Sequence, residues 1–248
     1  MIDEPFSEGT TLLHTTDPRI KVLAALALTL VLALTPSLLT AACGLATGTL
    51  LVLAARLNGR RVLQRLLAVN AFTLLLWLTL PFTYHSREII PTTLQFSPEG
   101  LRLATLITLK SNGVLLCLLA LLATSTIARL GHGLDGLGAP RRLTFLFLAS
   151  YRHIFLIHQE FQRLLRAARL RCFVPGNNLH TYRTVAHLLA MTLIKAWNRG
   201  QRVHQAMLLR GFRGQIHTLA QPHLTTIDLT LLVGLLLTAL TLLATNFL

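Results

Sequence analysis

Five long apolar runs limit this chain more strongly than any other feature of its sequence. They span residues 20–35, 37–55, 66–82, 103–123 and 227–247. A transmembrane helix needs about 20 apolar residues, or slightly fewer where the bilayer is thin. Hydrophobic residues form 53% of the chain and charged residues 13%, which leaves too little polar surface to cover a soluble globule of 248 residues. We therefore predict an all-α, polytopic membrane protein with about five transmembrane helices.

Short signals mark the ends of the first two runs. Asp17 is the expected N-cap of the first helix, with Pro18 at its first helical position. Thr35-Pro36-Ser37 separates the two runs, because proline removes a backbone donor and favours a helix break. The sequence predicts a tight helical hairpin at this point.

Positive charge predicts the orientation of the helices, because short cytoplasmic loops carry an excess of Lys and Arg. Twenty of the 23 Lys and Arg residues lie at the N-terminal flank of the first run, after the second run or after the fourth: Arg19, Lys21, Arg56, Arg60, Arg61, Arg65, Arg129, Arg141, Arg142, Arg152, Arg163, Arg166, Arg169, Arg171, Arg183, Lys195, Arg199, Arg202, Arg210 and Arg213. With five spans and a cytoplasmic N-terminus, all of these lie on the cytoplasmic side. The loop over residues 83–100 is then outside, and Arg87 is the only Lys or Arg residue in it.

A sixth span over residues 143–157 is the main alternative topology. It would bury Arg152, and a charge at mid-bilayer costs about 2.5 to 3.5 kcal/mol on insertion scales. It would also place the basic segment that follows outside the cell. We predict instead a long amphipathic helix over residues 140–171, whose apolar first half lies against the membrane part. One face of its second half carries Arg163, Arg166 and Arg169.

A second long helix is predicted over residues 181–210. Its apolar residues recur with helical spacing: Val185, Leu188, Leu189, Leu193, Ala196, Trp197, Val203 and Met207. The turn formers of residues 174–178 separate it from the first long helix, and Gly211 is placed to stop it. We expect the two long helices to cross or to pack as an antiparallel pair on the cytoplasmic face.

Nucleotide sites are not expected in this chain. Gly131, Gly133 and Gly136 have the spacing of a dinucleotide-binding turn, but that turn follows a strand, and here an apolar helix precedes it. We expect a flexible loop with a short helical turn instead. No Gly-x-x-x-x-Gly-Lys-Ser/Thr loop occurs, so any ATP that drives this protein is bound by another subunit.

Metal, cofactor and nucleic-acid sites are not expected either. The ten histidines include no i, i+4 pair on one helix face and no pair with a nearby carboxylate. Cys43, Cys117 and Cys172 lack the spacing of a disulfide framework or zinc site and are interpreted as packing residues. The net charge of +14 accompanies no nucleic-acid motif, and topology explains it better. The polar, acidic start of the chain does not resemble a cleavable signal peptide.

Lys110 is the one charge well inside a predicted span, which makes it a candidate functional residue. We favour the alternative that it reaches the outer interface near Arg102 or pairs with helix carbonyls. None of the nine carboxylates lies well inside a span, as a proton relay would require.

Both long helices are predicted to end in an arginine with Phe two positions later, at Arg171-Cys172-Phe173 and Arg210-Gly211-Phe212. A guanidinium beyond a helix end can enter a groove of a partner and donate to carboxylates and carbonyls. Alternatively, Arg210 only complements the negative end of its own helix dipole, a contribution of about 0.3 to 1 kcal/mol. The residues by themselves leave both interpretations open.

Three segments resemble the T components of energy-coupling factor transporters. AMLLRGFRG at 206–214, preceded by RGQRV at 199–203, is similar to the end of the last coupling helix of that family. Leu13-His14 with DPRIK at 17–21 resembles its N-terminal signature, and YRHIF at 151–155 with residues 166–173 resembles an earlier coupling helix. Within the family, the chain is most similar to the cobalt and nickel type, the CbiQ/NikQ group.

The resemblance implies a non-catalytic, cofactor-free subunit of an ATP-driven nickel or cobalt importer. It would be a multi-pass protein of a prokaryotic inner membrane, with a cytoplasmic N-terminus and cytoplasmic coupling helices. It would bind two cytoplasmic ABC-type ATPase subunits through its arginine tips and a substrate-binding membrane subunit, the S component. Residues 1–125 would hold the first four transmembrane helices, residues 126–215 the coupling helices and residues 216–248 the last transmembrane helix.

The resemblance also carries over site residues by position. The ATPase-coupling residues are Leu170, Arg171 and Cys172, which we name the first tip, and Leu209, Arg210 and Gly211, which we name the second tip. Supporting residues are Arg166, Arg169, Arg202 and Met207. The chain departs from the small-Arg-Gly pattern of the family, with Leu before both arginines and Cys172 in place of the first glycine. Because a non-glycine residue resists a left-handed turn, we expect the first tip to dock differently or to lie a residue or two away.

Other functions stay open at this point. A vitamin-type T component is one, because the family assigns substrate capture to another subunit. A membrane-bound enzyme that uses Lys110 or buried histidines is another, and it would be active in isolation. A self-contained channel would conduct ions from this polypeptide alone and would be indifferent to both arginine tips.

Overall fold

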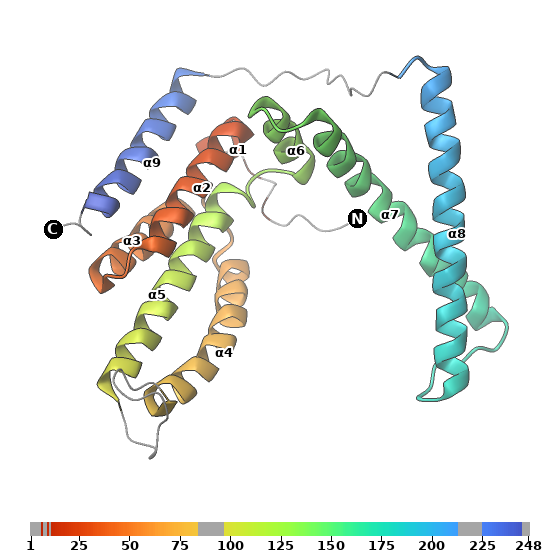
Figure 1. The fold of residues 1–248 in the computed structure, drawn as a ribbon, viewed down its shortest axis with the longest axis horizontal. Helices are drawn as coiled ribbons and strands as arrows, with labels where there is room; N and C mark the ends of the chain where they lie inside the picture. Colours follow the sequence, from red (N-terminus) through yellow and green to blue (C-terminus); the bar gives the residue numbers. More distant parts are fainter. Residues whose placement is uncertain (1–5, 7–8, 10, 84–96, 213–224, 245–248) are drawn as a thin grey trace. The chain divides into compact units, whose positions relative to one another are not determined.

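The computed structural model describes residues 6, 9, 11–83, 97–212 and 225–244, and the regular structure in these residues is helical. The helices are α1 (Leu12–Thr15), α2 (Pro18–Leu34), α3 (Leu38–Ala54), α4 (Gly59–Thr83), α5 (Pro98–Leu121), α6 (Ile127–Gly136), α7 (Arg141–Leu170), α8 (Leu179–Leu209) and α9 (Thr226–Ala244) (Figure 1). The chain forms two compact units. One contains α1 to α6 and α9, and the other, Gly138–Ala220, contains α7 and α8.

The larger unit is organised around α5, which packs against α2, α3 and α4, while α9 and α6 pack against α2. Its core consists of small and aliphatic side chains from α2, α5 and α9, including Ala24, Leu28, Leu32, Leu121 and Leu242. Helices α4 and α5 are also joined by polar contacts: Asn112 Nδ2 donates to Asn70 Oδ1 at 2.9 Å. The all-α prediction is therefore confirmed for the part of the chain that the structure describes.

The predicted ends of the first two long helices are confirmed. Helix α2 begins at Pro18, and a side-chain oxygen of Asp17 accepts a hydrogen bond from the Arg19 N–H at 2.9 Å. Helix α3 begins after Ser37, whose side chain accepts from Thr40 N–H. The predicted tight hairpin is different in detail, because α2 and α3 make only limited contact with each other, and α3 packs mainly on α5.

Glycines explain the close approach of α3 to α5. Gly44 and Gly48 are four residues apart on α3, and Gly113 faces them from α5. A Cβ at Gly48 would lie 3.1 Å from the Gly113 carbonyl oxygen, and a Cβ at Gly113 would lie 3.2 Å from the Leu45 nitrogen. Small residues with this spacing let helix backbones meet closely in membrane proteins, where burial of apolar surface does not drive association. The Gly-x-x-x-Gly pattern was a readable signal that the sequence analysis did not use.

Lys110 pairs with a helix carbonyl, as one of the favoured alternatives expected. Its Nζ donates to the Ala33 carbonyl oxygen at 3.0 Å. Ala33 lies in the last turn of α2, where the carbonyl oxygens have no N–H donor within their own helix. Lys110 supplies a donor to one of these oxygens, and its positive charge complements the negative end of the helix dipole. The role of Lys110 in this structure is therefore to join α5 to α2.

The expected loop with a short helical turn at residues 131–136 is wrong. These residues belong to α6, a helix of 10 residues capped by Thr126. Its glycines allow close packing on the start of α2, because a Cβ at Gly133 would lie 3.1 Å from the Pro18 side chain. None of the described residues forms the strand that a dinucleotide-binding turn follows, and Gly133 and Gly136 lie against the start of α2 instead. Helix α6, which the predicted domain boundary at residue 126 grouped with the coupling helices, packs in the larger unit.

Lys21, counted above among the cytoplasmic surface charges, is fully buried. Its Nζ donates to Ser125 Oγ at 2.6 Å and to Thr124 Oγ1 at 3.3 Å, both in the connection between α5 and α6. Nearby, the backbone N–H of Asp17 donates to Asp228 Oδ1 at 3.4 Å. A buried charge is tolerated only with such partners, and these contacts hold the starts of α2 and α9 and the end of α5 together.

Two helices in the described residues, α4 and α5, are long and apolar enough to cross a bilayer by length and composition. Helix α3 and residues Asp228–Ala244 of α9 are apolar but shorter. The count of five spans and the orientation of the chain remain predictions. The predicted outer loop falls largely on residues 84–96, outside the described residues.

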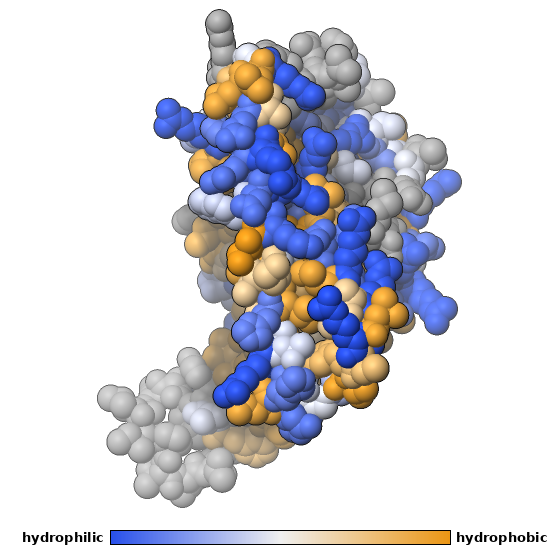
Figure 2. Space-filling view, turned by 90° about the vertical axis from the view of Figure 1, so that its right-hand side faces the viewer, coloured by the Kyte–Doolittle hydropathy of each residue, from blue (hydrophilic) through white to orange (hydrophobic). Residues whose placement is uncertain are grey.

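The smaller unit contains the two predicted long helices, and both are confirmed. Helices α7 and α8 pack against each other, and the turn between them falls on residues 171–178 as expected. The predicted apolar stripe of α8 divides between two faces. Val185, Leu188, Ala196, Val203 and Met207 are half-buried, whereas Leu189, Leu193 and Trp197 are exposed, Trp197 at 70%. Figure 2 shows one face of the molecule, on which hydrophobic and hydrophilic side chains alternate.

The contact between α3 and α5 generates a prediction. Gly48→Ile should lower the free energy of unfolding by about 1 to 3 kcal/mol, because the new side chain meets the backbone of α5 rather than a movable side chain. The measurement is the melting temperature of the purified protein in detergent. Gly234→Ile in α9 is the matched control, since nothing lies within 4 Å of a Cβ at that position. Equal melting temperatures for the two variants would contradict the proposed backbone contact.

Candidate functional site

The end of α7 forms a Schellman motif. Arg171 is the C-cap, with φ −93° and ψ 27°, and the next residue, Cys172, has a φ of +61°. The Cys172 N–H donates to the Arg169 carbonyl at 3.0 Å, and the Phe173 N–H donates to the Ala168 carbonyl at 3.1 Å. These bonds satisfy carbonyls that have no partner within the helix.

The end of α8 repeats this geometry. Arg210 is the C-cap, with φ −88° and ψ 9°, and Gly211 has a φ of +74°. The Gly211 N–H donates to the Leu208 carbonyl at 3.0 Å, and the Phe212 N–H donates to the Met207 carbonyl at 3.0 Å. The two tips therefore have the same backbone conformation, residue for residue, in sequences that differ at the glycine position.

The expectation that Cys172 would resist a left-handed turn is wrong, because Cys172 adopts this conformation in the place of the missing glycine. That the first tip docks differently, or that its coupling arginine lies a residue or two away, stays a prediction. A left-handed residue with a side chain costs about 1 to 2 kcal/mol. The two hydrogen bonds of the motif offset this cost, since without them the carbonyls at the end of α7 would lose their protein donors. Cys172 is also exposed, so it is not the packing residue that the sequence analysis expected.

The same side chains point outward at both tips. Leu170 is 87% exposed and Leu209 is 90% exposed, and Arg171 and Arg210 are exposed beside them. The phenylalanine that follows each tip is half-buried and lies against the pair of helices α7 and α8, which we call the hairpin. The ring centroid of Phe173 lies 6.4 Å from that of His180, and the ring centroid of Phe212 lies 5.1 Å from that of Phe145. Each tip thus presents one aliphatic side chain and one guanidinium on a turn that the phenylalanine anchors.

The supporting residues have different positions. Arg166 and Arg169 are exposed on the last turns of α7, and Arg202 is exposed on α8. Met207 is half-buried, and its carbonyl accepts the hydrogen bond that closes the α8 motif. The structure does not bring the two tips together into one site, because they lie at the ends of two different helices. Arg213 lies outside the described residues.

The turn between the helices is also ordered by hydrogen bonds. Thr181 Oγ1 accepts from the Gly176 N–H at 3.1 Å, and the Tyr182 hydroxyl donates to Asn177 Oδ1 at 2.8 Å. These bonds connect the turn to the first residues of α8, so the first tip is fixed to the start of α8 as well as to the end of α7.

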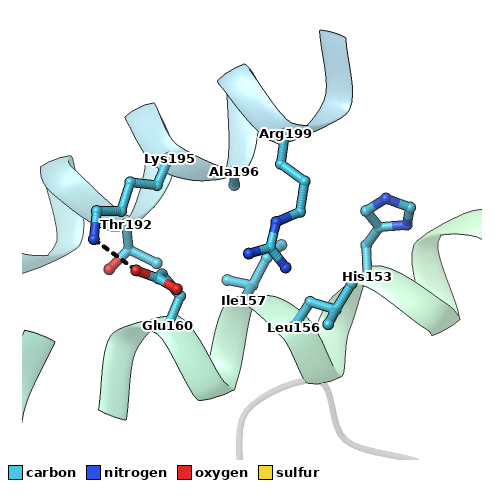
Figure 3. Close-up of a pocket in the computed structure, with 8 residues that line it drawn as sticks. All are labelled: His153, Leu156, Ile157, Glu160, Thr192, Lys195, Ala196 and Arg199. Atoms are coloured by element: carbon cyan, nitrogen blue, oxygen red, sulfur yellow. Dashed lines mark hydrogen bonds and ion pairs between the residues drawn. The ribbon is translucent and has the colours of Figure 1, made fainter. Parts of the chain in front are cut away.

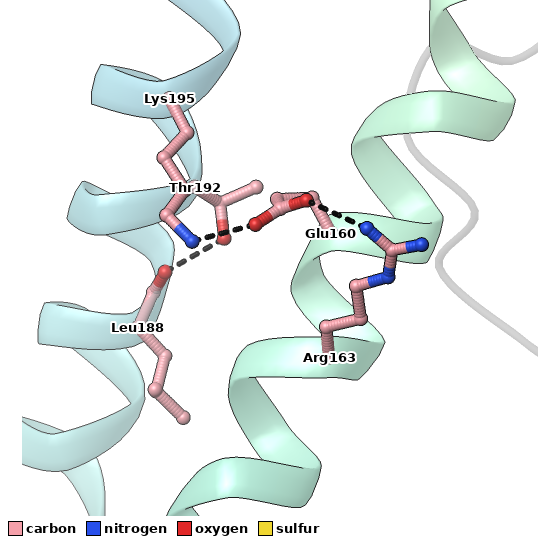
Figure 4. A network of polar contacts seen from close by, with 5 residues as sticks. All are labelled: Glu160, Arg163, Leu188, Thr192 and Lys195. Atoms are coloured by element: carbon pink, nitrogen blue, oxygen red, sulfur yellow. Dashed lines mark hydrogen bonds and ion pairs between the residues drawn. The ribbon is translucent and has the colours of Figure 1, made fainter.

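An ion pair links the two helices between the tips. Lys195 Nζ of α8 lies 2.6 Å from Glu160 Oε1 of α7, and Arg163 lies 3.8 Å from Glu160 Oε2 (Figure 4). The hydrogen bond from Lys195 holds the pKa of the Glu160 carboxyl below its usual value. The ion pair is therefore present at neutral pH, and its contribution is lost only as the pH falls through this lowered pKa. Sequence analysis missed Glu160, although it is the only acidic residue between Gly138 and Ala220.

A small cavity lies beside this ion pair. Its volume is about 50 Å³, and His153 and Arg199 line it together with Glu160 and Lys195 (Figure 3). No group of three or more His, Cys, Asp and Glu side chains that could hold a metal ion occurs in the described residues.

Comparison with known proteins places the chain in a family. The model of the cobalt transport protein family, CbiQ, matches residues 9–220, which include both tips. The chain belongs to the CbiQ family of cobalt transport proteins. The match begins before α2 and continues past α8, so the motifs at residues 13–21, 151–155 and 206–214 all fall within it.

Two similar proteins are known, one of which bears the name of this family. A cobalt transport protein CbiQ of Rhodobacter capsulatus is 26% identical over 190 residues, which cover 77% of this chain and 76% of that protein. An uncharacterised protein of Methanocaldococcus jannaschii is 26% identical over 121 residues, which cover 49% of this chain and 45% of that protein. Membership of a cobalt transport family, together with the apolar helices α4 and α5, identifies the chain as a membrane component of transport.

The left-handed residue at the first tip generates a second prediction. Cys172→Gly should stabilise the hairpin by about 1 kcal/mol, because glycine adopts a positive φ without the Cβ penalty. Gly211→Ala at the second tip should destabilise it by a similar amount for the same reason. The measurement is denaturant unfolding of the full chain, followed by Trp197 fluorescence in a Trp77→Phe background, since these are the two tryptophans of the chain. Destabilisation by Cys172→Gly would show that Cys172 has a favourable contact of its own.

Proposed function

We propose that this chain is the energy-coupling T component of an ATP-driven importer of cobalt or nickel. In this proposal, two cytoplasmic ATPase subunits bind the two tips, and a separate substrate-binding membrane subunit captures the ion. The chain connects the two kinds of subunit and carries no catalytic site of its own. It would be a multi-pass protein of a prokaryotic inner membrane, with its N-terminus and α7 and α8 in the cytoplasm.

The repeated tip is the observation that supports this proposal most directly. Two helix ends with the same Schellman geometry expose the same pair of side chains, Leu and Arg, on turns anchored by phenylalanine. Large apolar side chains that are almost fully exposed beside a guanidinium are costly in water and favourable in a partner's groove. Two copies of one partner would recognise two copies of one tip, as a pair of identical or related ATPase subunits requires.

The length of α8 supports one partner at each tip. The first tip is joined to the start of α8 by the turn, and the second tip is at the end of α8, a helix of 31 residues. At 1.5 Å per residue the two tips are separated by about 45 Å. A single groove that accepts a Leu-Arg turn is far smaller than this separation. Two separate binding sites therefore fit the geometry better than one.

Cobalt as the substrate rests on the family and on the name of the R. capsulatus relative, and nickel rests on the sequence resemblance to the cobalt and nickel type. A vitamin-type importer is the alternative, because the proposed division of labour places substrate capture in another subunit. The described residues that line cavities offer no cluster that favours an enzyme, and Lys110, the candidate for one, is engaged with a helix carbonyl.

The proposal predicts that the arginine of each tip is needed for assembly with the ATPase. Arg210→Ala and Arg171→Ala should each reduce the ATPase recovered with the tagged chain by tenfold or more. Loss of a central interface arginine costs about 2 kcal/mol or more, which is roughly a 30-fold change in affinity. The measurement is a detergent pull-down from the native membrane, with the recovered proteins identified by mass spectrometry.

Arg183→Ala is the matched control, because Arg183 is an exposed arginine of α8 that lies outside both tips. It should leave recovery unchanged. The identity of the membrane protein that copurifies would decide between a metal and a vitamin substrate. Recovery of ATPase that is equal in all four proteins, or recovery of the chain alone, would contradict the proposal.

A further inference from the structure

We propose that Glu160 is a positioning residue that sets how α7 crosses α8 and therefore where the two tips lie relative to each other. The structural part of this inference concerns the hairpin alone. Its consequence for transport rests on the function proposed above.

Glu160 occupies the middle of the contact between the helices. Its carboxylate accepts a hydrogen bond from Lys195 Nζ at 2.6 Å, and its side chain is only 15% exposed (Figure 4). Thr192, one turn before Lys195, is buried against the same place, and its hydroxyl donates to the Leu188 carbonyl of its own helix at 2.7 Å. The Thr192 hydroxyl is thus bonded within its own helix, and the Glu160 carboxylate is bonded when it contacts Lys195.

Charge allows Lys195 no other partner within the hairpin. Residues Gly138–Ala220 contain 13 Lys and Arg residues and one acidic residue, Glu160. Any other register or angle of α7 on α8 would place Lys195 against a neutral residue or another cation. A single buried or half-buried ionic contact of this kind is best known for selecting one register among several.

The apolar contact between α7 and α8 is too limited to fix the register and crossing angle of the two helices by itself. Thr192 is the only buried residue of α8, every residue of which is described. The apolar residues of α8 that face α7 are only half-buried. The Phe145–Phe212 contact lies at the far end of α8 and holds that end, but it does not define the contact in the middle. The ion pair is therefore the specific interaction at the crossing.

The ion pair lies far from both tips, so a small change in the angle between the helices at the ion pair displaces each tip by several ångströms. Glu160 is 11 residues before Arg171, and Lys195 is 15 residues before Arg210. At 1.5 Å per residue these arms are about 16 and 22 Å long, so a change of about 10° in crossing angle moves the second tip by about 4 Å. Two ATPase subunits that bind the two tips would respond to such a displacement.

The cavity beside the ion pair determines which substitution tests the proposal. Arg199 enters it from α8, one turn after Lys195, so Arg199 is available to Glu160 when Lys195 is removed (Figure 3). A Lys195 variant alone would leave this replacement in place. Glu160→Gln removes the only carboxylate while keeping the size and shape of the side chain, and it is the cleaner variant.

The test measures the distance between spin labels by double electron–electron resonance in the full chain in lipid nanodiscs. Labels are attached at Ala167→Cys and Gln205→Cys, two exposed positions near the two tips. The background carries Cys43→Ala and Cys172→Gly, and Cys117 is buried and does not react. We expect one narrow distribution for the parent, and in Glu160→Gln a distribution that is broader or shifted by about 4 Å.

Two further variants make the result specific. Arg163→Gln removes another cation near Glu160, but Arg163 is on α7 itself and its side chain is 68% exposed, so the distribution should not change. The exchange Glu160→Lys with Lys195→Glu restores an opposite-charge pair and should recover most of the narrow distribution. A Glu160→Gln distribution that matches the parent would overturn the proposal, as would an equal effect of Arg163→Gln.

Transport measurements then test the consequence. In the complex reconstituted with its copurified partners, Glu160→Gln should keep ATPase recovery within about twofold and reduce metal uptake per ATP hydrolysed by about tenfold. Unchanged uptake per ATP, with an altered distance distribution, would overturn the role in coupling. Failure of the parent chain to recover any ATPase would overturn the proposed function instead, and the distances would still decide the role of Glu160 in the hairpin.

Discussion

Helix ends dominate the physics of this chain, because the first N–H groups and the last carbonyls of each helix have no partner within it. In a protein this apolar, water is scarce around many of those groups, so protein groups must satisfy them. Asp17, Ser37, Ser97 and Thr126 cap the starts of α2, α3, α5 and α6. Lys110 satisfies a carbonyl at the end of α2 from the neighbouring helix α5. The Schellman turns at α7 and α8 are the same solution at the two helix ends to which we assign the function.

The need to satisfy the last carbonyls of a helix also explains how a Schellman motif can form a recognition surface. A Schellman motif turns the chain sharply, and the residue at the C-cap then projects beyond the helix. Here that residue is an arginine at both ends, and the phenylalanine two positions later packs back on the hairpin. The outward direction of Arg171 and Arg210 therefore follows from the turn that closes each helix.

Ionisable side chains away from the tips have positional roles in the two units. Lys21 joins the start of α2 to the connection between α5 and α6, and Lys110 joins α5 to α2. Glu160 joins α7 to α8. Sequence analysis counted Lys21 among the cytoplasmic charges, gave pairing with helix carbonyls as one favoured alternative for Lys110, and did not single out Glu160. The burial of Lys21 and the contact of Glu160 were missed for the same reason: a sequence shows the charge of a residue but not the partner from a distant part of the chain.

The sequence by itself determined the helical composition, most helix ends, the basic character of α7 and α8 and the family of the chain. These features depend on local spacing: apolar runs, proline and glycine positions, and short motifs that stay recognisable in isolation. The tertiary structure decided that Cys172 takes a left-handed conformation, that Gly133 and Gly136 of α6 pack on α2, and that Gly48 and Gly113 bring α3 to α5. Those outcomes depend on contacts between residues far apart in the chain, whose energies offset local preferences by one or two kcal/mol, and local spacing contains no record of them.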